Sequence, residues 1–410
     1  MTRYRAAWVL PVAQPPLRDG WVACEHGRIV AVGGPDDAAD GPEVDLGHVA
    51  LMPGLVNAHT HLELSYLRGQ VPVAPAFVTW IRGVVGARRQ RPDPNGAEIL
   101  DSVRAGIEEA VASGTALVGD ISNTLVTYGP LAESLLGGVV FYELLRFNAP
   151  DPDGVVAQAC AQLDALPAHP AVRPSLAAHA PYSVSPRVFR AIRRAMEARP
   201  GVPFSVHLAE STDETEFIRT AGGEWRRFLE DVGSWDPAFM APGVSPVQYL
   251  DDAGFLDARL LAVHGVQMTP ADLARLVARG TTLVTSPRSN LHTGAGVPPV
   301  ASFYASGVPV AVGTDSLAST PDLNVFSELA TLRRLAPEVP ARRLIASATI
   351  EGARALGFEG SFGTLETGRR ARVLAVAVPA RVNDVEEYLV SGITPDQLSW
   401  VGETVPASRA

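Results

Sequence analysis

Eight short apolar runs recur between residues 56 and 313, and helix-like stretches alternate with them. Continuous Val, Ile, Leu and Ala are typical of parallel strands that helices cover on both faces. Eight such strand-and-helix units predict an α/β fold, a (β/α)8 TIM-type barrel, with an open doubly wound sheet as the alternative. The runs are Val56–His61, Ala116–Ile121, Gly138–Leu145, Val172–His179, Pro203–His207, Leu260–Gly265, Thr281–Thr285 and Val308–Gly313.

The two ends of the chain read differently from the middle. Residues 3–55 form short strand-like pieces with turns between them, including a hairpin-type turn at Glu25–Arg28. Residues 363–378 and 398–405 are also strand-like, with a short helix expected near Asp384–Val390. We therefore expect residues 1–55 and 359–410 to build one small β-sandwich and residues 56–358 to form the barrel. Helices are expected at Asn95–Ala112, Arg187–Ala198, Asp213–Asp231, Pro270–Arg279 and Leu323–Leu335.

Composition excludes several classes of protein. The net charge of −10 argues against nucleic acid or an anionic membrane as the main partner. No apolar run reaches the length of a membrane span, and Pro11 interrupts an N-terminal piece that reads as a strand rather than a signal peptide. Cys24 and Cys160 form no disulfide or metal motif. We expect a cytoplasmic protein that acts on a small molecule, and a homo-oligomer remains open.

The chain contains no lysine, because arginine accounts for all 34 basic residues. This absence excludes a Schiff-base lysine, a phosphate-loop lysine and a carboxylated lysine that bridges two metal ions. A metal site in this chain is therefore predicted to hold one ion.

Most of the apolar runs end on a side chain that can do chemistry. In a barrel, functional groups lie where strands end and loops begin. Asp120 ends the second run, where a carboxylate often caps the following helix. Five of the nine histidines lie at run ends, and the other polar groups there follow closely in sequence. These residues are His59, His61, Glu63, Glu143, Arg146, His179, His207, Glu210, His264, Arg288, Ser289, Asn290 and Asp315.

A metal centre follows from the types of these residues. His59 and His61 are two apart on a predicted strand, so their side chains face the same side. Imidazoles and a carboxylate without a thiolate cluster suit Zn²⁺, with Fe²⁺ or Mn²⁺ as alternatives. We predict that His59, His61, His207 and Asp315 hold one divalent metal. Such a metal lowers the pKa of its bound water toward ~7, giving hydroxide at neutral pH, and Asp315 could take a proton from that water.

Two further residues are candidates for proton transfer. Glu210 lies three residues after His207, so by strand parity it would face away unless the strand has already turned. A turned Glu210 would stand at the mouth of the site, where partial burial raises the pKa of a carboxyl and suits it to act as general acid and base. His264 would lie across the mouth and polarise the metal-bound water.

Six motifs together resemble one enzyme family. The chain is similar to the amidohydrolase superfamily, specifically to the mononuclear branch of cytosine, guanine, adenosine and S-adenosylhomocysteine deaminases and triazine chlorohydrolases. The short stretches HTHLELS and FVTWIRGVV, at 59–65 and 77–85, look most like the aminodeoxyfutalosine deaminases of menaquinone biosynthesis. The six motifs are PGLVNAHTHLE at 53–63, HAPYSVS at 179–185, HLAE at 207–210, VHG at 263–265, SPRSNL at 286–291 and GTDSLAS at 313–319.

The resemblance implies a hydrolytic deaminase with the same four metal ligands. Glu210 would protonate a ring nitrogen, His264 would orient the attacking water, and His179 would contact the substrate. The implied substrate is 6-amino-6-deoxyfutalosine, an adenine nucleoside that carries a benzoate-like group at its 5′ end. The alternatives are another purine, a pyrimidine or a triazine, among them adenosine, S-adenosylhomocysteine, guanine and cytosine. A catalytically silent barrel that serves as a binding module is a more distant alternative, against which the intact ligand set argues.

A benzoate-like carboxylate needs a cation, and in a chain without lysine that cation is arginine or histidine. Arg288 and Arg146 follow predicted strands and are therefore expected ahead of Arg82, which lies after the first run. Glu63 is expected either to accept hydrogen bonds from ribose hydroxyls or to hold a metal-binding histidine in place.

Overall fold

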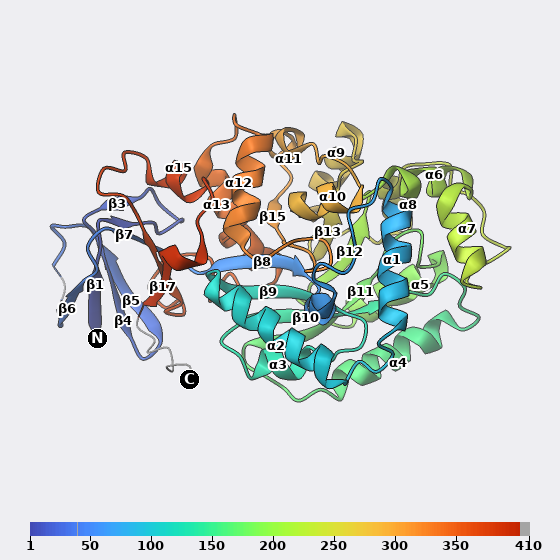
Figure 1. Ribbon diagram of the computed structural model, residues 1–410, viewed down its shortest axis with the longest axis horizontal. Coiled ribbons are helices and arrows are strands. Elements are labelled where there is room, and N and C mark those ends of the chain that lie inside the picture. Colours follow the sequence, from blue (N-terminus) through green and yellow to red (C-terminus); the bar gives the residue numbers. More distant parts are fainter. Residues whose placement is uncertain (39, 402–410) are drawn as a thin grey trace.

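The computed structural model describes residues 1–38 and 40–401, and its central feature is the expected barrel of eight parallel strands (Figure 1). The strands follow one another in chain order around the sheet. The first and last strands meet where Thr60 pairs with Asp315 and the Asp315 N–H donates to the carbonyl of His59 at 3.0 Å. The strands are β8 (Leu55–Thr60), β9 (Thr115–Ser122), β10 (Gly137–Leu144), β11 (Val172–Ala178), β12 (Phe204–Leu208), β13 (Leu260–His264), β14 (Thr282–Thr285) and β15 (Val310–Val312).

Helices surround the barrel, and several begin with recognisable caps. Thr269 and Asp272 form a reciprocal capping box at the start of α9, and Pro270 occupies its first turn. One expected helix, 213–231, is two helices, because Ala221 ends the first in a left-handed conformation and Gly222 and Gly223 begin the second. The first seven helices are η1 (Leu62–Leu67), α1 (Phe77–Arg89), α2 (Ala97–Ala112), α3 (Tyr128–Ala132), α4 (Pro152–Asp164), α5 (Pro186–Glu197) and α6 (Thr212–Thr220). The others are α7 (Gly223–Asp231), α8 (Pro246–Asp252), α9 (Pro270–Arg279), α10 (Pro287–Thr293), α11 (Val300–Ser306), α12 (Val325–Leu335), α13 (Ala341–Ser347), α14 (Ile350–Ala355), α15 (Val385–Leu389) and η2 (Pro395–Gln397).

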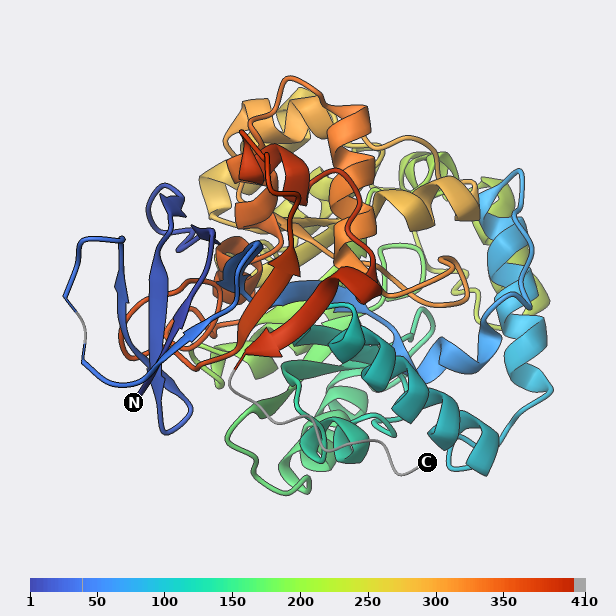
Figure 2. The same ribbon diagram turned by 60° about the vertical axis from the view of Figure 1, so that its left-hand side comes forward.

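Two small sheets lie beside the barrel and are built from both ends of the chain, as expected (Figure 2). In the larger one, β16 pairs antiparallel with both β7 and β17, so C-terminal strands join an N-terminal one. The expected hairpin joins β4 to β5, where His26 and Gly27 both have positive φ, as tight hairpin turns require. Residues 402–405 of the last expected strand lie outside the described residues. The strands are β1 (Thr2–Arg5), β2 (Trp8–Val9), β3 (Leu17–Arg18), β4 (Trp21–Glu25), β5 (Arg28–Gly33), β6 (Glu43–Asp45), β7 (Val49–Pro53), β16 (Val373–Ala377) and β17 (Leu398–Val401).

The closing seam of the barrel depends on one glycine. A Cβ added at Gly313, just after β15, would lie 2.6 Å from the Cβ and the carbonyl oxygen of His59. A residue without a side chain therefore lets β15 approach β8 closely. This approach brings Asp315 to the same end of the barrel as His59 and His61.

No helix in residues 1–38 and 40–401 is long and apolar enough to cross a membrane.

Candidate metal centre and active-site cavity

Four side chains from three strands converge at the end of the barrel where the strands finish. Asp315 Oδ1 lies 3.7 Å from His59 Nε2 and 3.5 Å from His61 Nε2. The ring centroid of His207 lies 5.0 Å from that of His59 and 5.4 Å from that of His61. Nδ1 of His207 contacts the carbonyl oxygen of His179 at 2.9 Å, which leaves Nε2 free for a ligand. The arrangement is a histidine-rich site that could hold a metal ion.

The state of these histidines fits a metal ion. Neither ring nitrogen of His59 has a hydrogen-bond partner among the described residues, although the side chain is 1% exposed. Buried polar atoms are nearly always paired, so an unpaired imidazole indicates a missing partner. Burial lowers the pKa of His207 to about 4 and that of His61 well below its usual value. Neutral imidazoles are the form that binds metals.

Backbone strain is concentrated around this centre. Ala209, His264 and Asp315 all have positive φ, at 53°, 79° and 62°. Such conformations are uncommon for residues other than glycine, and they often mark functional sites. Ala209 follows β12 directly, so the chain has turned before Glu210. Strand parity alone would have pointed Glu210 away from His207, and this turn lets it face the site.

Glu210 and His264 face each other beside the cluster. Glu210 Oε1 lies 3.6 Å from His264 Nε2, and both side chains are almost fully buried. Burial, reinforced by nearby Asp315 and Glu214, raises the pKa of Glu210 well above its usual value. Glu214 fixes the turn, because its two carboxylate oxygens accept hydrogen bonds of 2.9 Å from the N–H groups of Ala209 and Glu210.

A cavity of about 160 Å³ opens above these residues. One wall is apolar and comes largely from helices α1 and α7 and the loop after β11. The rings of Tyr182 and Trp225 stack there at 3.6 Å between centroids, and Phe77 packs against Trp225. This wall is formed by Phe77, Trp80, Ile81, Val84, Val85, Tyr182, Trp225, Phe228 and Leu229.

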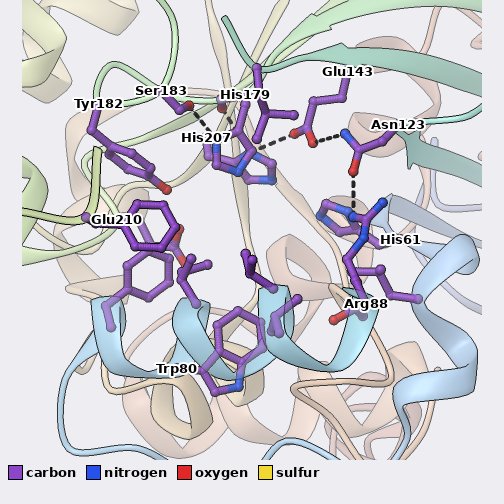
Figure 3. A pocket seen from close by; sticks show the side chains of 18 of the residues that line it. His61, Trp80, Arg88, Asn123, Glu143, His179, Tyr182, Ser183, His207 and Glu210 are labelled. Atoms are coloured by element: carbon purple, nitrogen blue, oxygen red, sulfur yellow. Dashed lines mark hydrogen bonds and ion pairs between the residues drawn. The ribbon is translucent and has the colours of Figure 1, made fainter. Parts of the chain in front are cut away.

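The other side of the cavity is polar (Figure 3). Arg88, in α1, donates to Asn123 Oδ1 at 2.7 Å, and Asn123 Nδ2 donates to Glu143 Oε2 at 2.7 Å. Glu143 Oε1 in turn lies 3.3 Å from Nδ1 of His207. In Figure 3, Tyr182 and Glu210 lie on one side of the cavity, whereas Arg88 and Asn123 lie on the other.

Three residues expected at the substrate do not line this cavity. Glu63 binds the loop after β9 instead of a substrate. Its carboxylate accepts hydrogen bonds from Ser122 Oγ and from the backbone N–H of Asn123, and it forms an ion pair with Arg88. Arg288 points away and pairs with Glu328 and Asp322, and Arg146 is exposed and donates to the carbonyl of Leu145. Arg82, the third arginine considered, pairs with Asp231. His179 does line the cavity, and its Nδ1 lies 2.6 Å from Ser183 Oγ.

The sequence did not predict the contacts by which Ser289, Asn290 and Asp120 support the site, and it gave no role to Arg88. Ser289 donates to Asp315 Oδ2, and the amide nitrogen of Asn290 lies 3.0 Å from His264 Nδ1. Asp120 accepts from the N–H of Leu62 at 2.8 Å and so fixes the chain directly after His61. It does not cap the following helix, as the sequence had suggested, because the N-cap of α3 is Thr127 and no side chain caps that helix. The only cue in the sequence was that these residues follow predicted strands, and Arg88, in the last turn of α1, lacked even that cue.

Comparison with known proteins agrees with this architecture. The model of the amidohydrolase family matches residues 50–396. An aminodeoxyfutalosine deaminase from Deinococcus radiodurans is 34% identical over 361 residues, which are 84% of this chain and 82% of that protein. A 5-methylthioadenosine/S-adenosylhomocysteine deaminase from Desulforudis audaxviator is 31% identical over 395 residues, 90% of this chain and 83% of that protein.

A solved structure agrees as well. The crystal structure of a Xanthomonas campestris adenosine deaminase with bound zinc superposes with a TM-score of 0.82 at 28% identity, covering 97% of this chain and 90% of that one. The barrel, the histidine-rich centre and the match over most of the chain therefore place this protein in the amidohydrolase family.

Proposed function

We propose that this enzyme is a metal-dependent deaminase that hydrolyses the 6-amino group of an adenine nucleoside, with 6-amino-6-deoxyfutalosine as the favoured substrate. The observation that carries the proposal is the buried pair of Glu210 and His264 beside the histidine–aspartate cluster. A buried carboxyl next to a metal centre suits proton transfer to a substrate more than it suits stability. The named activities of the two relatives support an adenine nucleoside as the substrate class.

The proposed metal ligands are His59, His61, His207 and Asp315. One divalent ion fits, with Zn²⁺ first and Fe²⁺ or Mn²⁺ as alternatives, because the donors are imidazoles and a carboxylate. When bound, the ion would supply Lewis-acid chemistry and lower the pKa of a water molecule toward ~7. The chain has no lysine to bridge a second ion.

The remaining steps belong to the side chains around the cluster. His264 orients the water that adds to the amine-bearing ring carbon, and Asp315 takes a proton from that water. Glu210 donates its proton to the adjacent ring nitrogen. The C–N bond then breaks, and ammonia leaves with the proton that Asp315 had taken from the water. The hydroxyl proton of the intermediate returns to Glu210, which gives the 6-oxo purine and restores both carboxyl groups. His179, which lines the same cavity, contacts the purine.

The cavity favours a nucleoside with a bulky 5′ substituent. Its apolar wall, which includes Trp80, Tyr182 and Trp225, can pack against such a group. Arg88 is the one arginine among the described residues that line the cavity. Its guanidinium uses two N–H groups on Glu63 and Asn123, and others remain for a carboxylate. We therefore assign the carboxylate-binding role to Arg88 instead of Arg288 or Arg146.

Replacing Arg88 with Gln is expected to lower kcat/KM for 6-amino-6-deoxyfutalosine by ~10-fold or more, because a charged hydrogen bond is lost. For adenosine, which has no carboxylate, the loss should be small. Ammonia release is measured at several concentrations of each nucleoside. For each nucleoside this gives the ratio of kcat/KM in Arg88→Gln to kcat/KM in the wild type.

Arg89→Gln is the matched control, since Arg89 is the exposed neighbour in the same helix. Equal losses for both nucleosides in Arg88→Gln would contradict the carboxylate role. If the wild-type enzyme turned over adenosine or guanine much faster than every 5′-modified nucleoside, the futalosine-type assignment would fail.

One observation favours a second substrate. Glu63 lies 3.0 Å from Arg88 and already balances its charge, so a neutral thioether substituent would fit the apolar wall as well. 5-Methylthioadenosine and S-adenosylhomocysteine are therefore the first alternatives, and the same assay separates them from the favoured substrate.

A further inference from the structure

A buried carboxylate oxygen next to the metal cluster lacks a donor. Glu143, in β10, is 5% exposed and lines the cavity. Its Oε2 accepts a hydrogen bond of 2.7 Å from Asn123, whereas Oε1 receives none from any described residue. A buried acceptor without a donor is costly and rare in folded proteins. We therefore expect a bound ligand to donate a hydrogen bond to Oε1 of Glu143 from the cavity.

Neighbouring side chains do not supply this donor. Nδ1 of His207 is 3.3 Å from Glu143 Oε1, but its single proton is directed to the carbonyl oxygen of His179 at 2.9 Å. Asn123 is held in one orientation, since its Oδ1 accepts from Arg88 while its Nδ2 donates to Glu143. The carboxylate is thus fixed from one side and open toward the cavity.

The chemistry of the substrate identifies the donor. An adenine nucleoside carries two kinds of donor, the 6-amino group and the sugar hydroxyls. The amino group has to lie at the metal cluster, beside Glu210 and His264, for the proposed hydrolysis to occur. Figure 3 shows Glu143 and Asn123 across the cavity from Glu210, so the sugar is the part of the nucleoside left to meet them.

We propose that Glu143, held in place by Asn123, binds the 2′,3′-diol of the pentose and makes the enzyme selective for ribonucleosides. This inference rests on the proposed function, because it takes an adenine nucleoside as the substrate. The competing role for Glu143 is structural, namely orientation of His207 through the contact at 3.3 Å. The two roles differ in what they predict for substrates that lack the hydroxyls.

The test compares adenosine with 2′,3′-dideoxyadenosine in the wild-type enzyme and in Glu143→Gln. Asn123 would hold the amide oxygen of the new Gln and turn its NH₂ group toward the sugar, so the acceptor is lost. In the wild type, kcat/KM for the dideoxy nucleoside is expected to be ~10-fold to ~100-fold below that for adenosine. In Glu143→Gln, adenosine should lose most of this advantage, while the dideoxy nucleoside changes little.

Two results would overturn the diol assignment: a wild-type enzyme that does not discriminate, or equal losses for both nucleosides in Glu143→Gln. Equal losses together with reduced zinc content would instead assign Glu143 to the orientation of His207. Glu133→Gln, at an exposed glutamate, is the matched control.

If Glu143→Gln does not fold, Asn123→Ala tests the same subsite. This substitution removes the donor that holds Oε2 of Glu143. The ratio of kcat/KM for adenosine to kcat/KM for 2′,3′-dideoxyadenosine should therefore fall below the wild-type ratio. An unchanged ratio would count against the proposal. Failure of the proposed function is distinct, because the wild type would then release no ammonia from any adenine nucleoside.

Discussion

His61→Asn is expected to abolish ammonia release from adenine nucleosides. His61 Nε2 lies 3.5 Å from Asp315 Oδ1, and we infer that both groups bind the same ion. Removing a residue that only supports a metal ligand weakens metal binding by ~10–100-fold, so the loss of a ligand itself should exceed that range. Atomic emission measures the zinc content of the variant, and initial rates of ammonia release measure its activity.

His48→Asn, at an exposed histidine that does not line the cavity, controls for the substitution itself. A His61→Asn enzyme that retained both its zinc and its rate would remove His61 from the ligand set. Loss of rate with full zinc content would assign His61 a role in the reaction rather than in metal binding.

Glu210→Gln should lower kcat by ~10²–10⁴-fold, the range for loss of a general acid or base. Gln has nearly the same size as Glu, and the backbone N–H of residue 210 would still donate to Glu214, so the turn should persist. The amide cannot donate an acidic proton to the ring nitrogen. Steady-state kinetics with parallel zinc analysis is the measurement, and we expect zinc content to stay at the wild-type level.

Glu216→Gln, at an exposed glutamate in the following helix, is the matched control for Glu210→Gln. A kcat near the wild-type value in Glu210→Gln would show that another group protonates the substrate. His264, whose Nε2 is 3.6 Å from Glu210, would then be the first candidate.

The barrel could be predicted from the sequence because its strands are buried on both faces. Each of the eight apolar runs corresponds to a strand, within a few residues at either end. The converging histidines were also predictable, since the ends of neighbouring parallel strands meet at one rim. The break between α6 and α7 was missed, although the consecutive glycines Gly222 and Gly223 mark it in the sequence.

Substrate contacts were harder to predict than metal ligands, because they depend on where long side chains point. Arg288 follows a strand, yet its guanidinium turns to buried Glu328. Arg88 lies in the last turn of α1, and only the packing of that helix across the mouth aims it into the cavity. Glu63 lies next to the metal motif in the sequence, but its carboxylate accepts hydrogen bonds from residues at the end of β9 and in the loop after it. None of these orientations follows from position along the chain.

The most direct test of the central claim is a zinc titration of the metal-free enzyme that follows ammonia release from an adenine nucleoside. The rate should rise linearly and stop rising at one zinc ion per chain, because the four proposed ligands form one site and the chain has no lysine to bridge a second ion. A rate that is independent of zinc, or a break at two ions per chain, would contradict the account.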